Sequence, residues 1–245
     1  MKADPDAQRR LLELQAIDTS LTQLAHRGRT LPEHAELARQ EEELRRLSDE
    51  RAKALVAVDD LDRDIARLER DVEMVRQRAA KDQQRLDSGA GTAKELTSLQ
   101  HEIATLARRQ AELEDAELEL MEQREQAQAT LDGIDSRLAA LQQERDATQQ
   151  RRDAALAEIA AEEERLRAER GPLADSLPDD LLALYERIRE QTGQGAALLR
   201  AGRCEGCRLE LSGSDLARVR AAAPEEVVRC EECRRILVRT HESGL

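Results

Sequence analysis

Ser88-Gly89-Ala90-Gly91-Thr92-Ala93-Lys94-Glu95 is the stretch of sequence that decides the fold. Its two glycines interrupt a long helical pattern. Thr92 followed by Glu95 is a capping box, in which each side chain satisfies a backbone N–H at the start of a new helix. The stretch therefore predicts a tight turn near residues 88–92, between a helix that ends and a helix that begins.

On both sides of this turn, apolar residues recur at alternating steps of three and four. Before the turn the repeat includes Leu44, Leu47, Val58, Leu61, Ile65, Leu68, Val72 and Val75. After the turn it includes Leu96, Leu99, Ile103, Leu106, Leu113, Leu120, Ile134, Leu138 and Leu141. This spacing is typical of coiled coils. Two such arms joined by a short turn predict a mainly α fold built on a long antiparallel coiled-coil hairpin.

The arm before the turn is expected to contain two helices. Asp4-Pro5 suits a helix start, because Asp can cap and Pro is tolerated in the first turn. Gly28 is expected to end this helix, and Thr30-Leu31-Pro32-Glu33 is a second capping box that starts the next one. The sequence thus predicts helices over residues 5–27, 32–87 and 93–169, with a break near 28–32.

All four cysteines lie in two Cys-x-x-Cys pairs, Cys204-Glu205-Gly206-Cys207 and Cys230-Glu231-Glu232-Cys233, with 22 residues between the pairs. Two such pairs supply four thiolates to one tetrahedral zinc ion and leave no position for water, so a structural site is predicted. The absence of an apolar leader argues against a disulfide framework, and a redox dithiol needs only one pair. An iron–sulfur centre also accepts four thiolates and stays an alternative.

The residues around the cysteines predict a small β ribbon. Ser176-Leu177-Pro178-Asp179 starts a short helix that Gly193 and Gly195 end. Strands are expected at 196–200, 227–228 and 236–238, with a short helix or turn over 214–221. We therefore divide the chain into a coiled-coil hairpin, residues 1–171, and a short helix with a C4 zinc ribbon, residues 172–245.

Composition supports long helices over an ordinary globular core. The chain has no Phe, no Trp and one Tyr, and 37% of its residues are charged. No run approaches the ~20 apolar residues of a membrane span, so a cytoplasmic protein is expected. The net charge is −13, yet residues 200–245 hold nine Arg and eight acidic residues. The negative charge therefore lies on the helices, where it opposes binding of a polyanion.

Four stretches resemble the bacterial C4-type zinc-ribbon family of predicted nucleic-acid-binding proteins, which join a coiled-coil hairpin to a C-terminal ribbon. They are Thr92-Ala93-Lys94-Glu95-Leu96-Thr97-Ser98-Leu99-Gln100-His101-Glu102-Ile103, Leu184-Tyr185-Glu186-Arg187-Ile188-Arg189, Cys204-Glu205-Gly206-Cys207 and Cys230-Glu231-Glu232-Cys233-Arg234-Arg235-Ile236-Leu237. The resemblance implies binding of RNA or of an alternative sigma factor. The chain departs from the family pattern at Glu231, where Pro is common, and at Arg234, where Gly is common.

The candidate site residues fall into a metal set and a contact set. One structural Zn²⁺ is predicted at Cys204, Cys207, Cys230 and Cys233. Contacts to phosphate are predicted at Arg203, Arg208, Arg234 and Arg235, although nearby glutamates can equally balance these arginines on a solvated surface. Lys94 and Glu95 at the hairpin turn are candidates for a partner contact, or are simply the flanks of a capped turn.

The sequence predicts a regulatory binding protein rather than an enzyme. It contains no Ser/His/Asp set, phosphate-binding loop or dinucleotide fingerprint, so neither catalysis nor a small-molecule substrate is expected. The expected partners are RNA or DNA, the transcription or RNA-processing machinery, or both. The alternative is a coiled-coil adaptor, for example one that binds a sigma factor, with no direct contact to nucleic acid. No membrane partner is expected.

Overall fold

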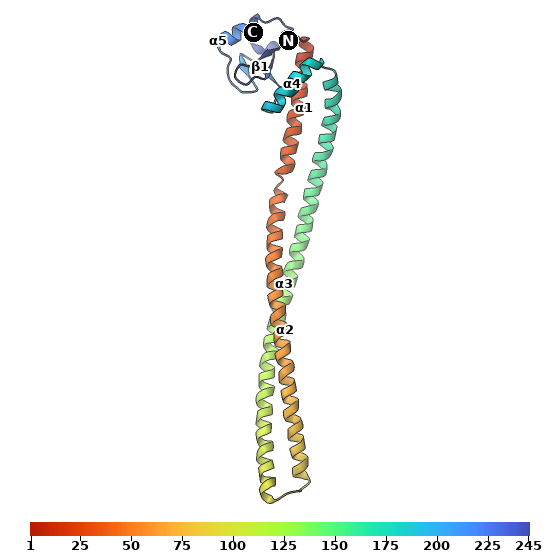
Figure 1. The fold of residues 1–245 in the computed structure, drawn as a ribbon, viewed down its shortest axis with the longest axis vertical. Coiled ribbons are helices and arrows are strands. Elements are labelled where there is room, and N and C mark those ends of the chain that lie inside the picture. Colours follow the sequence, from red (N-terminus) through yellow and green to blue (C-terminus); the bar gives the residue numbers. More distant parts are fainter. The chain divides into compact units, whose positions relative to one another are not determined.

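The computed structural model describes all residues, Met1–Leu245, and is mainly helical with a small C-terminal sheet (Figure 1). In chain order the elements are α1 Pro5–Arg29, α2 Pro32–Asp87, α3 Ala93–Asp175, α4 Asp179–Thr192, β1 Ala196–Arg200, β2 Arg203–Cys204, α5 Gly213–Ala221, β3 Val228–Arg229, β4 Ile236–Val238 and the 3₁₀ helix His241–Ser243. The chain divides into two compact units. One is Ala35–Gln149, and the other combines Met1–His34 with Gln150–Leu245. This division is by packing, whereas the predicted boundary at residue 171 rests on sequence pattern and stays a prediction.

The unit Ala35–Gln149 is an antiparallel helical hairpin, as the sequence predicts. Several ion pairs connect α2 to α3, among them Arg78–Glu102, Asp62–Arg124 and Arg51–Asp135. Residue numbers rise along α3 as they fall along α2, so the helices run in opposite directions. The apolar seam lies between them, with Leu47, Val58, Val72, Leu113, Leu131 and Ile134 buried. The ion pairs are exposed and contribute little stability, so burial of the seam holds the hairpin together.

The turn between the arms forms as its sequence predicts. Gly89 and Gly91 have φ values of 68° and 147°, a region that L side chains rarely adopt. The backbone N–H of Thr92 donates to the Glu95 carboxylate at 2.7 Å, and the backbone N–H of Glu95 donates to the Thr92 hydroxyl at 3.4 Å. Both halves of the capping box are therefore present, and they start α3.

The first arm breaks between Arg29 and Pro32, inside the predicted interval. The predicted end at Gly28 is wrong by a short distance, because α1 continues through Gly28 to Arg29. The backbone N–H and the hydroxyl of Thr30 bond to carbonyls of the last turn, including that of His26. These bonds satisfy carbonyls that would otherwise lack partners, so Thr30, and not Gly28, terminates the helix.

Helix α3 ends later than the sequence indicates. We expected it to end near residue 169, before Gly171-Pro172, but it runs to Asp175 and includes Pro172. A proline costs a helix most in its interior, where it removes a hydrogen bond and its ring meets the preceding turn. Pro172 therefore weakens the helix at this point without ending it, and its own carbonyl still accepts from the N–H of Ser176 at 3.2 Å.

The C-terminal sheet has four short strands in the order β2-β1-β4-β3. The pairing of β1 with β4 is parallel, and the other two pairings are antiparallel. The N-terminal segment joins this region, because Lys2 forms a β-bridge with Glu226 and the N–H of Ala3 donates to the carbonyl of Glu225 at 2.7 Å. The sequence pattern predicted the ribbon but gave no sign that Met1–Asp4 belongs to it.

The two faces of this sheet pack on two different cores. Side chains alternate along a strand, so Ile236 and Val238 point to one face and Leu237 to the other. Ile236 and Val238 pack with Leu11, Leu14, Leu181 and Tyr185 from α1 and α4. Leu237 packs with Leu199, Val219, Cys204 and Cys230. The unbroken apolar run at 236–238 is thus explained by burial on both faces.

None of the helices combines the length and apolar composition that crossing a membrane requires.

Candidate metal centre and its surroundings

Two tight turns with the same backbone geometry carry the four cysteines. We call Cys204–Arg208 the first knuckle and Cys230–Arg234 the second knuckle. The N–H of Arg208 donates to the Cys204 carbonyl at 2.7 Å, and the N–H of Arg234 donates to the Cys230 carbonyl at 2.9 Å. Arg208 and Arg234 have φ values of 61° and 62°, in the left-handed region. This geometry favours glycine, which gives a physical reason for glycine being common at the position of Arg234 in the family.

The four sulfurs fit one tetrahedral zinc ion. The Sγ atoms of the four cysteines all lie within 4.8 Å of one another. The Sγ atoms of Cys204 and Cys233 are 3.8 Å apart, and those of Cys207 and Cys230 are 3.9 Å apart. A tetrahedron with Zn–S bonds of ~2.3 Å has sulfur–sulfur edges of ~3.8 Å, whereas a disulfide requires ~2 Å. The cysteines are free, and the shell leaves no open position, so the site is a structural one.

The cysteine environment links metal binding to pH. Burial raises the pKa of the Cys204 and Cys230 thiols. Burial also opposes the thiolate of Cys233, but hydrogen bonds from the backbone N–H of Arg235 and from neighbouring cysteines lower its pKa overall. Zinc binds the thiolate form, so loading the site must displace protons from the buried sulfurs.

The four arginines predicted as phosphate contacts occupy different environments. Arg203 pairs with Glu210 at 3.3 Å, and Arg234 pairs with Glu231 at 3.3 Å. Arg208 is exposed and makes no ion pair. Arg235 turns inward, where its Nη2 donates to the Thr192 carbonyl at 3.1 Å and its Nε is buried. The sequence placed these residues beside the cysteines, but it could not indicate which of them are free.

The two candidates at the hairpin turn also differ. Glu95 belongs to the capping box, and hydrogen bonds from the backbone and then the side chain of Thr92 lower the pKa of its carboxyl group. Lys94 is exposed, and its side chain makes no ion pair. The assignment of these residues, and of the four arginines, to partner contacts stays a prediction.

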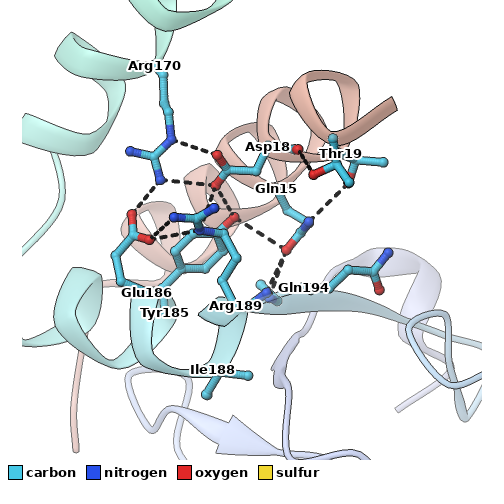
Figure 2. Close-up of polar contacts among 12 residues, drawn as sticks. Gln15, Asp18, Thr19, Arg170, Tyr185, Glu186, Ile188, Arg189 and Gln194 are labelled. Atoms are coloured by element: carbon cyan, nitrogen blue, oxygen red, sulfur yellow. Dashed lines mark hydrogen bonds and ion pairs between the residues drawn. The ribbon is translucent and has the colours of Figure 1, made fainter. Parts of the chain in front are cut away.

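A buried polar network that the sequence did not reveal lies in the same compact unit (Figure 2). At its centre Asp18 of α1 is only 4% exposed. Its carboxylate accepts two hydrogen bonds from Arg170 of α3, at 2.7 and 3.1 Å, and one from the Tyr185 hydroxyl of α4, at 2.7 Å. Glu186 contacts both Arg170 and Arg189. Burial and the hydrogen bond to Asp18 raise the pKa of Tyr185, and the same carboxylate raises the pKa of Arg170.

Gln15 extends this network to the sheet. Its Oε1 accepts hydrogen bonds from the backbone N–H groups of Gly195, at 2.7 Å, and Ala196, at 3.3 Å, at the start of β1 (Figure 2). The helical repeat offered one weak signal. Position 18 lies four residues after Leu14 on the buried face of α1, so the acidic residue there needs a partner.

Comparison with known proteins now identifies the fold family. Residues 14–193 match the model of the CT398-like coiled coil hairpin domain. The chain belongs to this family. Residues 203–237 match the C4-type zinc ribbon domain, which confirms both the predicted resemblance and the zinc assignment.

Relatives of similar length match nearly the whole chain. The Mycobacterium tuberculosis protein Rv2229c is 43% identical over 239 residues, which are 98% of each chain. The Mycobacterium leprae protein ML1638 is 31% identical over 216 residues, covering 88% of this chain and 93% of that protein. A solved structure from Mycobacterium smegmatis is 40% identical with a TM-score of 0.87, over 98% of this chain and 100% of that one. CT398 from Chlamydia trachomatis, 19% identical with a TM-score of 0.66 over 95% of this chain and 97% of its own, shares the fold.

Proposed function

We propose that the protein is a non-enzymatic adaptor that binds a protein partner through its zinc ribbon and helical hairpin, in a regulatory role. One observation carries the proposal. Of the four arginines beside the knuckles, Arg203 and Arg234 are paired with glutamates and the Nε of Arg235 is buried. A surface whose cations are already neutralised binds phosphate weakly, because affinity for nucleic acid depends on free Lys and Arg that displace counterions.

The charge of the hairpin supports the same choice. Residues 35–149 carry 28 acidic and 18 basic side chains, so this unit repels a polyanion. The ribbon also lacks the aromatic side chains on which single-stranded bases stack, since the only aromatic residue is the buried Tyr185. Four thiolates require a reducing compartment, and the proposal therefore assigns the protein to the cytoplasm.

Binding of nucleic acid through the ribbon is the second candidate. Arg208 and Arg220 favour it, because both are exposed and make no ion pair. Two phosphate contacts on a single strand predict a shallow dependence of affinity on salt, with a log–log slope of about −1.4. The variant Arg208→Gln should flatten that slope by about half if this candidate is correct.

Photocrosslinking in cells distinguishes the two candidates. Leu209 beside the first knuckle is 51% exposed, so a photoreactive residue at that position samples the surface of the ribbon. We expect adducts that a protease removes and a nuclease does not. The same position in a Cys207→Ser background, which cannot hold zinc with four thiolates, is the control and should lose the adduct. Nuclease-sensitive adducts, together with RNA binding that follows the expected salt slope, would replace the adaptor proposal by the second candidate.

A further inference from the structure

The side chain of Arg235 crosses from one knuckle to the other. Its backbone follows the second knuckle, yet its side chain lies over Gly206 of the first. A Cβ atom placed on Gly206 would come within 2.8 Å of the Cδ of Arg235 and 3.5 Å of its Nε. Glycine at position 206 therefore leaves the space that the Arg235 side chain occupies.

The guanidinium group is held at one end and has no partner at the other. Its Nη2 donates to the carbonyl of Thr192, the last residue of α4, at 3.1 Å. Its Nε is buried and has no hydrogen-bond partner among the protein atoms. A buried donor of a charged group is rarely left without a hydrogen bond in proteins, so an acceptor is expected next to it.

The zinc-loaded knuckles supply such an acceptor. Four thiolates outweigh the charge of Zn²⁺, so the loaded centre is a negatively charged group within a largely buried site. Thiolate sulfur accepts hydrogen bonds, and charge-assisted bonds are stronger than neutral ones. Cys233 lies two residues before Arg235 in the second knuckle, and its sulfur belongs to the four-sulfur cluster.

We propose that Arg235 is an outer-sphere partner of the zinc centre, in which its Nε–H donates a hydrogen bond to the thiolate of Cys233. The positive charge of Arg235 then offsets the negative charge of the centre, and its Nη2 connects the centre to the end of α4. Arg235 is therefore a positioning residue of the metal site and is not available to bind phosphate. A side chain at position 206 would meet Arg235 and also the Cβ of Ala197, which would lie 2.9 Å from the added Cβ.

Metal release tests the energetic part of the proposal. In competition with a chelator, the full-length Arg235→Gln protein should bind zinc about 10- to 100-fold more weakly than the wild type, the usual effect of removing an outer-sphere partner. Arg234→Gln is the matched control, since Arg234 is exposed and should leave the affinity unchanged. Arg235→Lys keeps the charge without the planar donor and should fall between the two.

A spectroscopic test examines the hydrogen bond directly. In protein loaded with ¹¹³Cd, the Nε–H proton of Arg235 should show scalar coupling to the metal through the Cys233 sulfur. Far-ultraviolet circular dichroism and Tyr185 fluorescence should match the wild type in each variant, which separates loss of the partner from unfolding. The proposal requires both results. Absence of the coupling, or zinc release from Arg235→Gln at the rate of Arg234→Gln, overturns it.

Discussion

Asp18→Asn is the substitution that most directly tests how the helices of the ribbon-containing unit are held together. Asparagine keeps the size of the side chain and removes its charge. The change weakens the two hydrogen bonds from Arg170 and the one from Tyr185, and it leaves Arg170 with Glu186 as its remaining anionic partner. Breaking a buried ion pair costs about 3–5 kcal/mol. The Arg170 side chain is 23% exposed and keeps one partner, so we expect a loss of about 2–4 kcal/mol.

Tyrosine fluorescence is a specific assay for this loss. Tyr185 is the only aromatic residue of the chain, so its emission reports on this network alone. With a urea dependence of about 2 kcal/mol per molar, the expected loss lowers the midpoint of the Tyr185 transition by about 1–2 M. Far-ultraviolet circular dichroism, which is dominated by the long helices, should show a smaller shift.

Asp6→Asn provides the control. Asp6 also lies in α1 and pairs with Arg9, but the two side chains are 71% and 53% exposed. An exposed pair of this kind contributes well under about 1 kcal/mol. If Asp18→Asn and Asp6→Asn give the same Tyr185 midpoint, the network does not hold the helices together and the reasoning is wrong.

Three further predictions concern the metal, the pH dependence and the second knuckle. Elemental analysis should find about one zinc per chain, and Cys207→Ser should release it while circular dichroism shows helix content nearly unchanged. Burial raises the Tyr185 pKa above its ordinary value of about 10, so this tyrosine ionises in the unfolded chain before it ionises in the folded one. The free energy of unfolding should therefore hold below about pH 10 and fall above it by up to about 1.4 kcal/mol per pH unit. Alkaline urea titrations measure this slope, and Tyr185→Phe should remove it. Arg234 has a left-handed backbone conformation, which costs an L-residue about 1–2 kcal/mol, and Arg234→Gly removes this strain. Glycine also increases the conformational entropy of the unfolded chain, which offsets part of the benefit. Thermal unfolding of the zinc protein should therefore show a gain in stability of at most about 1 kcal/mol, and a clear loss of stability would show that the backbone at position 234 is not strained.

The features that sequence could predict are those encoded by neighbouring residues. The turn follows from Gly89, Gly91 and the Thr92–Glu95 box, all within a few residues of one another. The hairpin follows from heptads on each side of that turn. The metal site follows from two Cys-x-x-Cys pairs, since each pair defines half of a tetrahedron by itself.

The features that sequence could not predict depend on residues far apart in the chain. Asp18 meets Arg170 across 152 positions, and the bond from the N–H of Gly195 to Gln15 spans 180. No local pattern specifies such partners. The inward orientation of the Arg235 side chain could not be predicted either. Arg234 and Arg235 are the same residue type and differ only in the surroundings that the fold gives them. The two-sided burial at 236–238 likewise depends on α1, which lies at the other end of the chain.

The alternation along β4 bears on what zinc stabilises. Leu237 and its neighbours pack with the cysteines, whereas Ile236 and Val238 pack with α1 and α4. A zinc ribbon that stood alone would depend on its metal for most of its stability, because a small core cannot offset the loss of chain entropy. Here one face of the sheet has a second core that needs no metal. Loss of zinc should therefore release the knuckles while the face that carries Ile236 and Val238 stays packed on the helices. Arg235, which follows the second knuckle, also bonds to these helices, because its Nη2 donates to the carbonyl of Thr192 at the end of α4, the helix that contributes Tyr185 to the buried network.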